Sequence, residues 1–324
     1  MKRTVFSILF CIIHSVSAQR EYTISGYVKE LSSGEALFGV NVLIDGTLGT
    51  TTNEYGFYSI SLSRGPHTVV VSYLGFQTIS EEITLDSDRR VNFDLREESN
   101  ALDEVVVTSS SKGNDVRSVE MSVATLKTGI IKKLPPAIGE VDVLKSIQLL
   151  PGVSSVSEGS SGFNVRGGSS DQNLVLLDEA TIFNASHLLG FFSVFNADAV
   201  KDIKLYKGGI PATFGGRLSS VLDIKQKEGN LKEFGGELGI GLISSRALIE
   251  GPITKGDQDE GRGSYLLAGR RSYIDLFAPL LEDLEDTQLY FYDINLKVNY
   301  NLNENNRLFL SGYFGQDKFA VENI

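Results

Sequence analysis

The sequence predicts a multi-domain chain built mostly from β-strands, in which a small β-sandwich precedes an α+β domain and a set of long amphipathic strands. Three observations lead to this fold class. Short β-rich runs bounded by turn residues recur up to residue 97, and a glycine-rich stretch of mixed helical and strand character extends to residue 229. Longer segments with alternating apolar residues then continue to residue 324. The chain is therefore expected to contain more than one packed core.

Composition places the chain among folded proteins and excludes one class of partner. Hydrophobic residues make up 41% and charged residues 22% of the 324 residues. The formal net charge is -11, and no cluster of five or more basic residues occurs. Because binding to a polyanion depends on clustered Lys and Arg, we expect no nucleic acid partner.

Residues 1–18 have the basic, apolar and small-residue parts of a secretory signal peptide, ending in Val16-Ser-Ala18. Their apolar run is too short to span a bilayer as a helix, which takes about 20 residues. The only cysteine, Cys11, lies in this segment. Disulfides and thiol-based metal or redox sites are therefore not expected in the mature chain, and no cofactor is expected.

Residues 20–97 are predicted to form an antiparallel β-sandwich. Gly, Asn and Asp mark the turns, for example at Asp45-Gly46 and Asn53-Glu-Tyr-Gly56. The expected strands are Tyr22–Glu30, Val40–Ile44, Gly49–Thr52, Phe57–Leu62, His67–Leu74, Thr78–Leu85 and Arg90–Leu95. His67 is interpreted as an ordinary strand or surface residue, because no His-x-x-Glu zinc pair accompanies it.

Residues 98–118 read as a polar linker that encloses one strand-forming segment. Residues 103–108 are Asp103, Glu104, Val105, Val106, Val107 and Thr108. Valine and threonine favour an extended backbone, and the flanking polar residues offer them nothing local to pack on. The segment is suited to pairing with the sheet edge of another protein. The alternative is an extra strand of one of the neighbouring domains.

Residues 119–229 are predicted to form a small α+β domain. A helix is expected over Ile138–Leu150, strands at Phe163–Val165, Leu174–Leu177 and Ile203–Tyr206, and a short helix near Asn196–Val200. No nucleophile elbow, P-loop or Gly-x-Gly-x-x-Gly turn occurs, so we do not expect an enzyme. A polar loop carries three candidate ligand contacts, Asp171, Gln172 and Asn173, and His187 is a fourth; a solvated loop and a packed histidine are the alternatives.

Residues 230–324 contain long strands with alternating apolar residues. They are expected at Gly235–Gly251, Ser264–Ile274, Tyr290–Leu302 and Arg307–Lys318, with aromatic residues near their ends. Alternation with terminal aromatics is typical of a transmembrane β-barrel wall, although a soluble sheet produces similar alternation. No later apolar run approaches the length of a membrane helix, so any membrane-embedded part must consist of strands.

Several motifs occur in a characteristic order in the α+β domain. They are Pro151-Gly-Val153, Asn164-Val-Arg-Gly-Gly168, a strand ending in Leu177-Asp178, Lys204-Leu-Tyr-Lys-Gly-Gly209 and Phe214-Gly-Gly-Arg217. Together they resemble the plug domain of TonB-dependent outer-membrane receptors. The run from Gly39-Val-Asn-Val42 to Ser72-Tyr-Leu-Gly-Phe76 resembles the carboxypeptidase-regulatory-like domain, a transthyretin-like sandwich often placed before such receptors in Bacteroidetes.

The resemblance implies import of a scarce nutrient across the outer membrane, with the N-terminal sandwich in the periplasm. It implies that the segment 103–108 is the TonB box, which the periplasmic protein TonB grips, and that Arg166 and Arg217 hold the plug against acidic residues of the barrel wall. Lipid and an imported small ligand are the other implied partners. The phrase Asp-Gly-Val-Pro, usual in the starch-utilisation branch, is replaced here by Asp178-Glu-Ala-Thr181.

The last 95 residues supply only part of a barrel, because a wall that encloses a plug has about 22 strands. We therefore expect an N-terminal fragment of a longer receptor, with an incomplete transmembrane β-barrel over 230–324. The alternative is a secreted or periplasmic β-sandwich binding protein without transport activity. The coding sequence beyond codon 324 would distinguish them, since only the receptor requires several hundred further codons of amphipathic strands.

Overall fold

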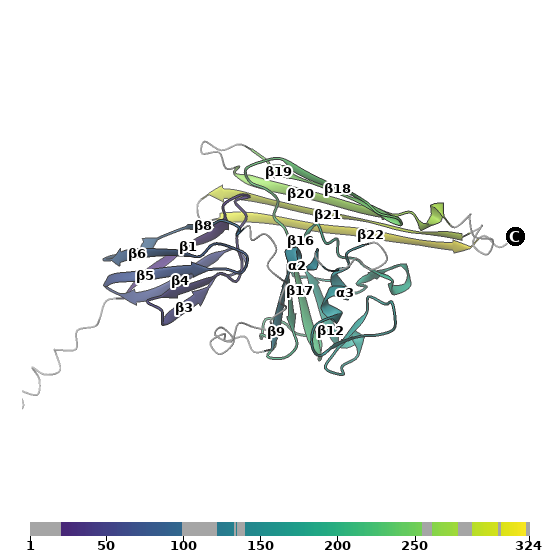
Figure 1. Ribbon diagram of the computed structural model, residues 1–324, viewed down its shortest axis with the longest axis horizontal. Coiled ribbons are helices and arrows are strands. Elements are labelled where there is room, and N and C mark those ends of the chain that lie inside the picture. Colours follow the sequence, from purple (N-terminus) through teal and green to yellow (C-terminus); the bar gives the residue numbers. More distant parts are fainter. Residues whose placement is uncertain are drawn as a thin grey trace, which may run out of the picture. The chain divides into compact units, whose positions relative to one another are not determined.

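The computed structural model describes residues 21–98, 122–132, 134, 140–254, 261–277, 287–303 and 306–321 (Figure 1). The chain divides into two compact units, residues 1–104 and 105–324, which we describe separately. Within the described ranges, no helix has both the length and the apolar character needed to cross a membrane.

The first unit is a β-sandwich of two sheets. One sheet has the order β4-β1-β7, with β8 also pairing with β1, and the other has the order β3-β2-β5-β6. The strands are β1 Glu21–Glu30, β2 Asn41–Ile44, β3 Leu48–Thr51, β4 Phe57–Ser63, β5 Gly65–Ser72, β6 Ile79–Leu85, β7 Arg89–Arg90 and β8 Phe93–Leu95. Alternate residues of both sheets, such as Ile24 and Val28 of β1 and Val42 and Ile44 of β2, face a common core. The predicted last strand, Arg90–Leu95, is divided into β7 and β8.

The central domain is the part of the second unit up to residue 229. Its five-stranded sheet has the order β13-β12-β17-β16-β9, and only the β12–β17 pair is parallel. These strands are β9 Val123–Lys127, β12 Asn173–Leu177, β13 Ala180–Thr181, β16 Val200–Tyr206 and β17 Ser220–Gln226. Short elements surround the sheet: α2 Thr128–Ile131, α3 Val143–Gln148, β10 Val153–Ser155, β11 Phe163–Val165, η1 Ser170–Gln172, β14 Ser186–His187, η2 Leu188–Gly190 and β15 Phe192–Ser193.

One helix of the central domain is well explained by its sequence. Asp142 precedes α3 and its carboxylate accepts a hydrogen bond from the backbone N–H of Lys145, at 3.0 Å, which caps the helix. Val143, Leu144 and Ile147 of α3 are buried in the core of the domain. The predicted helix, Ile138–Leu150, is longer than the observed one: residues 140–142 precede α3 and are not helical, and residues 138 and 139 lie outside the described residues.

The helix predicted near Asn196–Val200 is wrong. The segment is a turn that leads directly into β16. The Asn196 side chain accepts a hydrogen bond from the backbone N–H of Asp198 at 3.0 Å, and the Asn196 carbonyl accepts one from Ala199 at 3.0 Å. An Asn side chain that bonds its own backbone two residues further on favours a turn over a helix.

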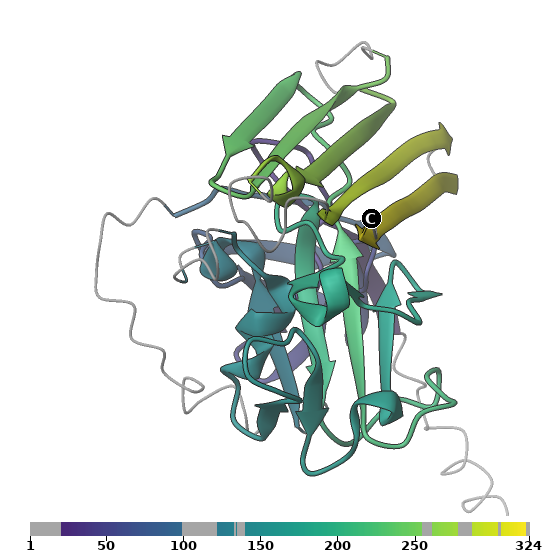
Figure 2. The same ribbon diagram turned by 90° about the vertical axis from the view of Figure 1, so that its right-hand side faces the viewer.

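The C-terminal sheet is an antiparallel meander in the order β18-β19-β20-β21-β22. Its strands are β18 Gly235–Ile240, β19 Ser244–Pro252, β20 Gly263–Ser272, β21 Thr287–Asn303 and β22 Asn306–Val321, with η3 Ile274–Leu276 after β20. The single strand predicted over Gly235–Gly251 is wrong, because the chain reverses after Ile240 and forms a hairpin. Gly241 closes that turn by donating from its N–H to the Ser244 carbonyl at 2.8 Å. The sheet lies along one side of the central domain (Figures 1 and 2).

Candidate functional site

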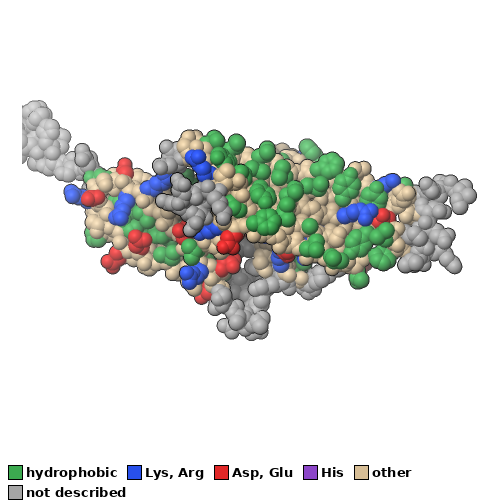
Figure 3. Space-filling view, turned by 90° about the horizontal axis from the view of Figure 1, so that it is seen from above, with side chains coloured by type: hydrophobic (Ala, Val, Ile, Leu, Met, Phe, Trp, Pro, Cys, Tyr) green, Lys and Arg blue, Asp and Glu red, His purple; other side chains and the backbone are tan. Residues whose placement is uncertain are grey.

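The C-terminal sheet has a polar face toward the central domain and an apolar face toward the outside. In β21 the buried residues include Asp293, Asn295, Lys297 and Asn299, whereas the intervening Ile294 and Leu296 are exposed. Hydrophobic side chains gather over the outer face of this sheet (Figure 3). A soluble sheet buries its apolar face, so the polarity of this sheet is the reverse of that in a soluble protein.

Arg270 of β20 is the most enclosed cation in the ion pairs described between the sheet and the central domain. Its side chain is 2% exposed. The guanidinium donates to Asp293 Oδ2 of β21 from Nη2 at 2.6 Å and from Nε at 3.0 Å. It also donates from Nη1 to Glu140 Oε1 of the central domain at 2.5 Å and from Nη2 to the Ser193 carbonyl at 2.7 Å. One arginine thus joins two parts of the second unit through a buried, charge-assisted network.

His187 of the central domain is buried against β21 and β22. Its ring stacks on Phe291 with centroids 4.4 Å apart. Nδ1 lies 2.9 Å from Asp317 Oδ2, and Nε2 lies 3.2 Å from the Tyr313 hydroxyl and 3.3 Å from Asp293 Oδ2. The histidine proposed from sequence as a ligand contact is therefore fully engaged within the interface.

Asp178 reaches the same sheet from the turn between β12 and β13. Its Oδ2 lies 2.7 Å from Lys297 Nζ of β21 and also accepts hydrogen bonds from Ser311 and from the Gln226 amide. Burial alone would raise the pKa of the Asp178 carboxyl, but the charge of Lys297 and these hydrogen bonds lower it below its ordinary value. Asp178 is therefore held as the carboxylate.

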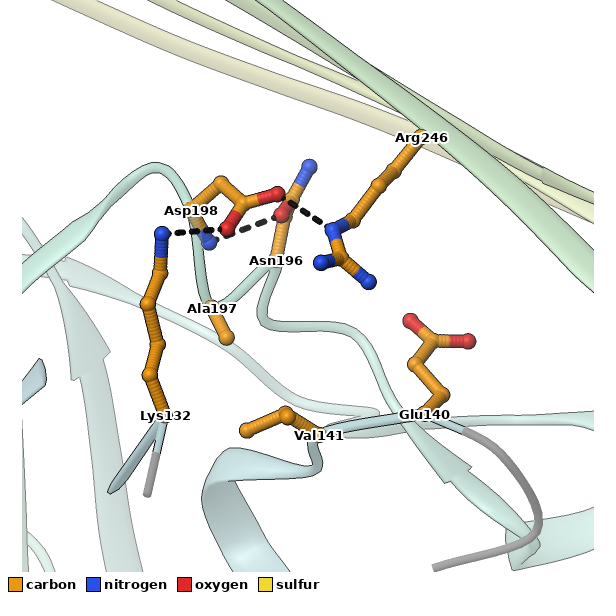
Figure 4. Close-up of a pocket in the computed structure, with 7 residues that line it drawn as sticks. All are labelled: Lys132, Glu140, Val141, Asn196, Ala197, Asp198 and Arg246. Carbon is orange, nitrogen blue, oxygen red and sulfur yellow. Dashed lines mark hydrogen bonds and ion pairs between the residues drawn. The ribbon is translucent and has the colours of Figure 1, made fainter. Parts of the chain in front are cut away.

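Two further carboxylates of the central domain meet cations of the sheet. Glu228 Oε2 accepts from Arg307 Nη2 of β22 at 2.7 Å. Asp198 lies between Lys132 Nζ of the central domain, at 2.7 Å, and Arg246 Nε of β19, at 2.6 Å (Figure 4). Lys132 also lies 3.1 Å from Glu237 of β18. Burial alone would lower the pKa of Lys132, but its two acidic neighbours raise it.

Four of these ion pairs place the acid on the central domain and the base on the sheet, opposite to the arrangement expected for Arg166 and Arg217: Glu140–Arg270, Asp178–Lys297, Asp198–Arg246 and Glu228–Arg307. The Lys132–Glu237 pair has the reverse arrangement. Arg166 donates to the Ser122 hydroxyl at 3.1 Å, within the central domain. Arg217 is exposed and donates to the carbonyl of neighbouring Gly216 at 3.2 Å. Neither contacts the sheet strands through any interaction among the described residues.

The other predicted site residues are distributed differently. Asp171 is exposed in η1, and Gln172 beside it is partly buried. Asn173 is buried; its amide donates to the Phe163 carbonyl at 2.8 Å and its oxygen accepts from Ser220 at 2.7 Å. The segment 103–108 lies outside the described residues. The structure thus brings His187 into the interface and leaves Asp171 to Asn173 elsewhere.

Sequence reasoning missed the interface residues, although a signal for some of them was present. Asp293, Asn295, Lys297 and Asn299 recur with a period of two, which predicts a polar strand face opposite the apolar one. No comparable signal identifies their partners, because Glu140 and Arg270 are 130 residues apart in sequence.

Comparison with known proteins adds two domain assignments. Residues 24–107 match the model of the CarboxypepD_reg-like domain, and residues 115–220 match the model of the TonB-dependent receptor plug domain. Over 248 residues the chain is 28% identical to the TonB-dependent receptor SusC of Bacteroides thetaiotaomicron, which covers 71% of this chain and 23% of the relative. It is 30% identical over 143 residues to the TonB-dependent receptor P3 of Formosa agariphila, covering 43% of this chain and 14% of that receptor.

Solved structures give weaker likenesses. The ferric enterobactin receptor of Pseudomonas aeruginosa superposes with a TM-score of 0.42 at 20% identity, over 60% of this chain and 33% of the receptor. The outer-membrane transporter YddB of Escherichia coli gives a TM-score of 0.44 at 14% identity, over 61% of this chain and 33% of the transporter.

Taken together, the fold and the domain matches define a receptor in which a plug domain packs on the first strands of a β-barrel wall. The chain carries the plug domain of the TonB-dependent receptors, with a carboxypeptidase-regulatory-like sandwich ahead of the plug. The predicted fold class is confirmed. The chain spans about a quarter or less of the length of the two curated relatives described above.

Proposed function

We propose that the chain serves in the active import of a scarce nutrient across the outer membrane, as part of a receptor driven by TonB. The polarity of the C-terminal sheet carries this proposal. Its apolar outer face suits lipid, and its polar inner face holds the central domain through buried ion pairs. Once the two surfaces separate, water can take the place of these polar contacts, which it cannot do for the contacts of an apolar core.

We further propose that the N-terminal sandwich lies in the periplasm and that TonB binds residues 103–108 in the linker that follows it. The plug-domain match supports this partner, since the segment precedes the match, which begins at residue 115. The valine-rich segment favours an extended backbone, which could pair as an added strand with the edge of the partner's sheet. In this scheme the domains are a signal peptide (1–18), sandwich (20–97), linker (98–118), plug (119–229) and partial barrel (230–324).

The loop that carries Arg217 joins the far ends of β16 and β17. The near ends meet the C-terminal sheet, where Ala199 packs with Leu248 and Leu266. Seven-residue strands place the loop roughly 20 Å from that sheet. Arg217 is therefore suited to contact acidic residues of another part of the wall, while Arg166 acts inside the plug. The exposed Asp171 and neighbouring Gln172 are the residues we assign to the ligand, with the buried Asn173 supporting them from within. His187 lies in the interface with the C-terminal sheet, away from this loop.

The partner assignment is tested with a proline in the segment. Val106→Pro removes a backbone donor and should abolish capture of the chain by the periplasmic domain of TonB in a pull-down assay. Ser110→Pro, which places the same residue in the adjacent polar linker, is the matched control and should leave capture unchanged. Equal capture of the Val106→Pro variant and the parent chain would refute the assignment.

A further inference from the structure

The contacts between the central domain and the C-terminal sheet are unequal in their access to water. Arg270 is 2% exposed and its partner Glu140 is 6% exposed. Asp198 and its two cations, Lys132 and Arg246, form a second contact, which we call the Asp198 cluster. There Lys132 is 32% exposed and Arg246 is 33% exposed, although Asp198 itself is buried. Separating a buried pair leaves uncompensated charges, whereas water can solvate partly exposed partners as they separate.

A small pocket adjoins the Asp198 cluster. Its lining residues are Lys132, Glu140, Val141, Asn196, Ala197, Asp198 and Arg246 (Figure 4). Asn196 is 2% exposed, and its Nδ2 has no hydrogen-bond acceptor among the described residues. A buried amide donor without a partner is costly, and an ordered water commonly satisfies such a group where polar neighbours offer further bonds. The carboxylate of Asp198, which lines the same pocket, offers an acceptor for that water.

Lys132 gives this cluster a second possible pairing. It lies 2.7 Å from Asp198 of the central domain and 3.1 Å from Glu237 of the sheet, so either carboxylate can retain it. It directly follows α2, which the Thr128 hydroxyl attaches to β16 by donating to the Val200 carbonyl at 2.5 Å. A displacement of β9 and α2 would therefore act directly on the contact between Lys132, Asp198 and Glu237.

We propose that the pocket at Asn196, Asp198 and Arg246 binds an ordered water, and that this hydrated contact is where the central domain first separates from the C-terminal sheet. The network around Arg270 stays closed at that stage. The importance of a first point of separation rests on the proposed function, since it matters only if the plug moves. The hydration site itself follows from the unpartnered Asn196 amide and its polar surroundings.

Single cysteines can test this, because Cys11→Ser removes the only cysteine of the chain. Ala197→Cys places a thiol in the pocket lining, and Ser193→Cys places a nearly isosteric one beside Arg270. Each variant is expressed in cells, and the labelling rate by a small water-soluble methanethiosulfonate is measured in outer-membrane preparations. We expect residue 197 to label about tenfold faster than residue 193, as local opening allows.

A second substitution identifies the contact responsible. Lys132→Gln should raise the labelling rate at position 197 by about fivefold, because it removes a partly exposed ion pair that holds the contact closed. The labelling rate at position 193 should not change. Lys207→Gln, which removes a cation elsewhere in the central domain, should change neither rate. Equal rates at the two positions, or an equal increase at both in Lys132→Gln, would overturn the proposal. Labelling requires neither TonB nor a ligand, so it can fail or succeed independently of the import test.

Discussion

At the scale of single residues, Arg270 is expected to matter most for stability. Arg270→Gln would leave Glu140 and Asp293 buried without their cation, and we expect the free energy of unfolding to fall by about 3–5 kcal/mol. Denaturant unfolding in detergent measures it. Arg271→Gln is the matched control, because the adjacent Arg271 is exposed, forms an i,i+4 ion pair with Asp275 and lies over the Tyr290 ring. Its replacement should lower the free energy of unfolding by less than about 1 kcal/mol. Similar losses in both variants would contradict the account.

His67 gives the sandwich a defined pH dependence. Its Nδ1 lies 2.7 Å from Asp45 Oδ2, and Nε2 lies 2.8 Å from the Ser63 carbonyl. The hydrogen bond with Asp45 raises the pKa of His67, and the same bond lowers the pKa of Asp45. The pair therefore stabilises the sandwich above the ordinary pKa of Asp45 and below that of His67, and its contribution is lost as pH rises through the elevated His67 pKa.

We therefore expect the parent sandwich to unfold at a higher temperature at pH 5.5 than at pH 8.5. In His67→Gln the difference between these two pH values should shrink, because glutamine does not titrate. Melting curves of both proteins at the two pH values provide the measurement. A difference of the same size in His67→Gln would mean that another group causes it.

At the scale of elements, β1 depends on a residue without a side chain. A Cβ on Gly26 would lie 1.7 Å from the carbonyl oxygen of Val91, which itself accepts a hydrogen bond from the Tyr58 hydroxyl at 2.8 Å. Gly26→Ala must displace backbone, so we expect it to cost about 1–3 kcal/mol of sandwich stability. On β3, a Cβ on Gly49 would meet nothing closer than 3.4 Å. Gly49→Ala should change the free energy of unfolding by about 0.5 kcal/mol or less, and an equal loss in both would refute this reason.

At the scale of the whole molecule, the sequence predicted the elements better than their contacts. The sandwich strands follow local turn and β-branched signals, and the predicted Phe163–Val165 strand coincides with β11. The prediction of elements was wrong where a helical pattern coincides with a turn, as at Asn196. It was also wrong where a strand-like run contains a hairpin turn, as at Gly241. The central strand β17 was not predicted, although it holds the sheet together between β12 and β16.

The ion pairs between the central domain and the C-terminal sheet could not be predicted from the sequence, for a different reason. Arg166 and Arg217 lie in recognisable motifs, whereas Arg270, Lys297 and Arg307 lie in strands outside any such motif. Their partners Glu140, Asp178 and Glu228 become identifiable only when the sheet packs on the central domain. Burial selects these pairs, and burial is a property of the assembled fold.

The most direct test of the account asks which face of β21 contacts lipid. Spin labels attached in the Cys11→Ser chain at Ile294→Cys, Leu296→Cys and Val298→Cys should collide freely with lipid-soluble oxygen in outer-membrane vesicles, whereas a label at Asn295→Cys should be shielded. This period of two follows from the alternating burial of the strand. The reference is a spin label at Tyr55→Cys, which is exposed in the sandwich. If the labels at 294, 296 and 298 collide with a water-soluble nickel complex as often as this reference label does, the outer face is not in lipid and the import account is contradicted.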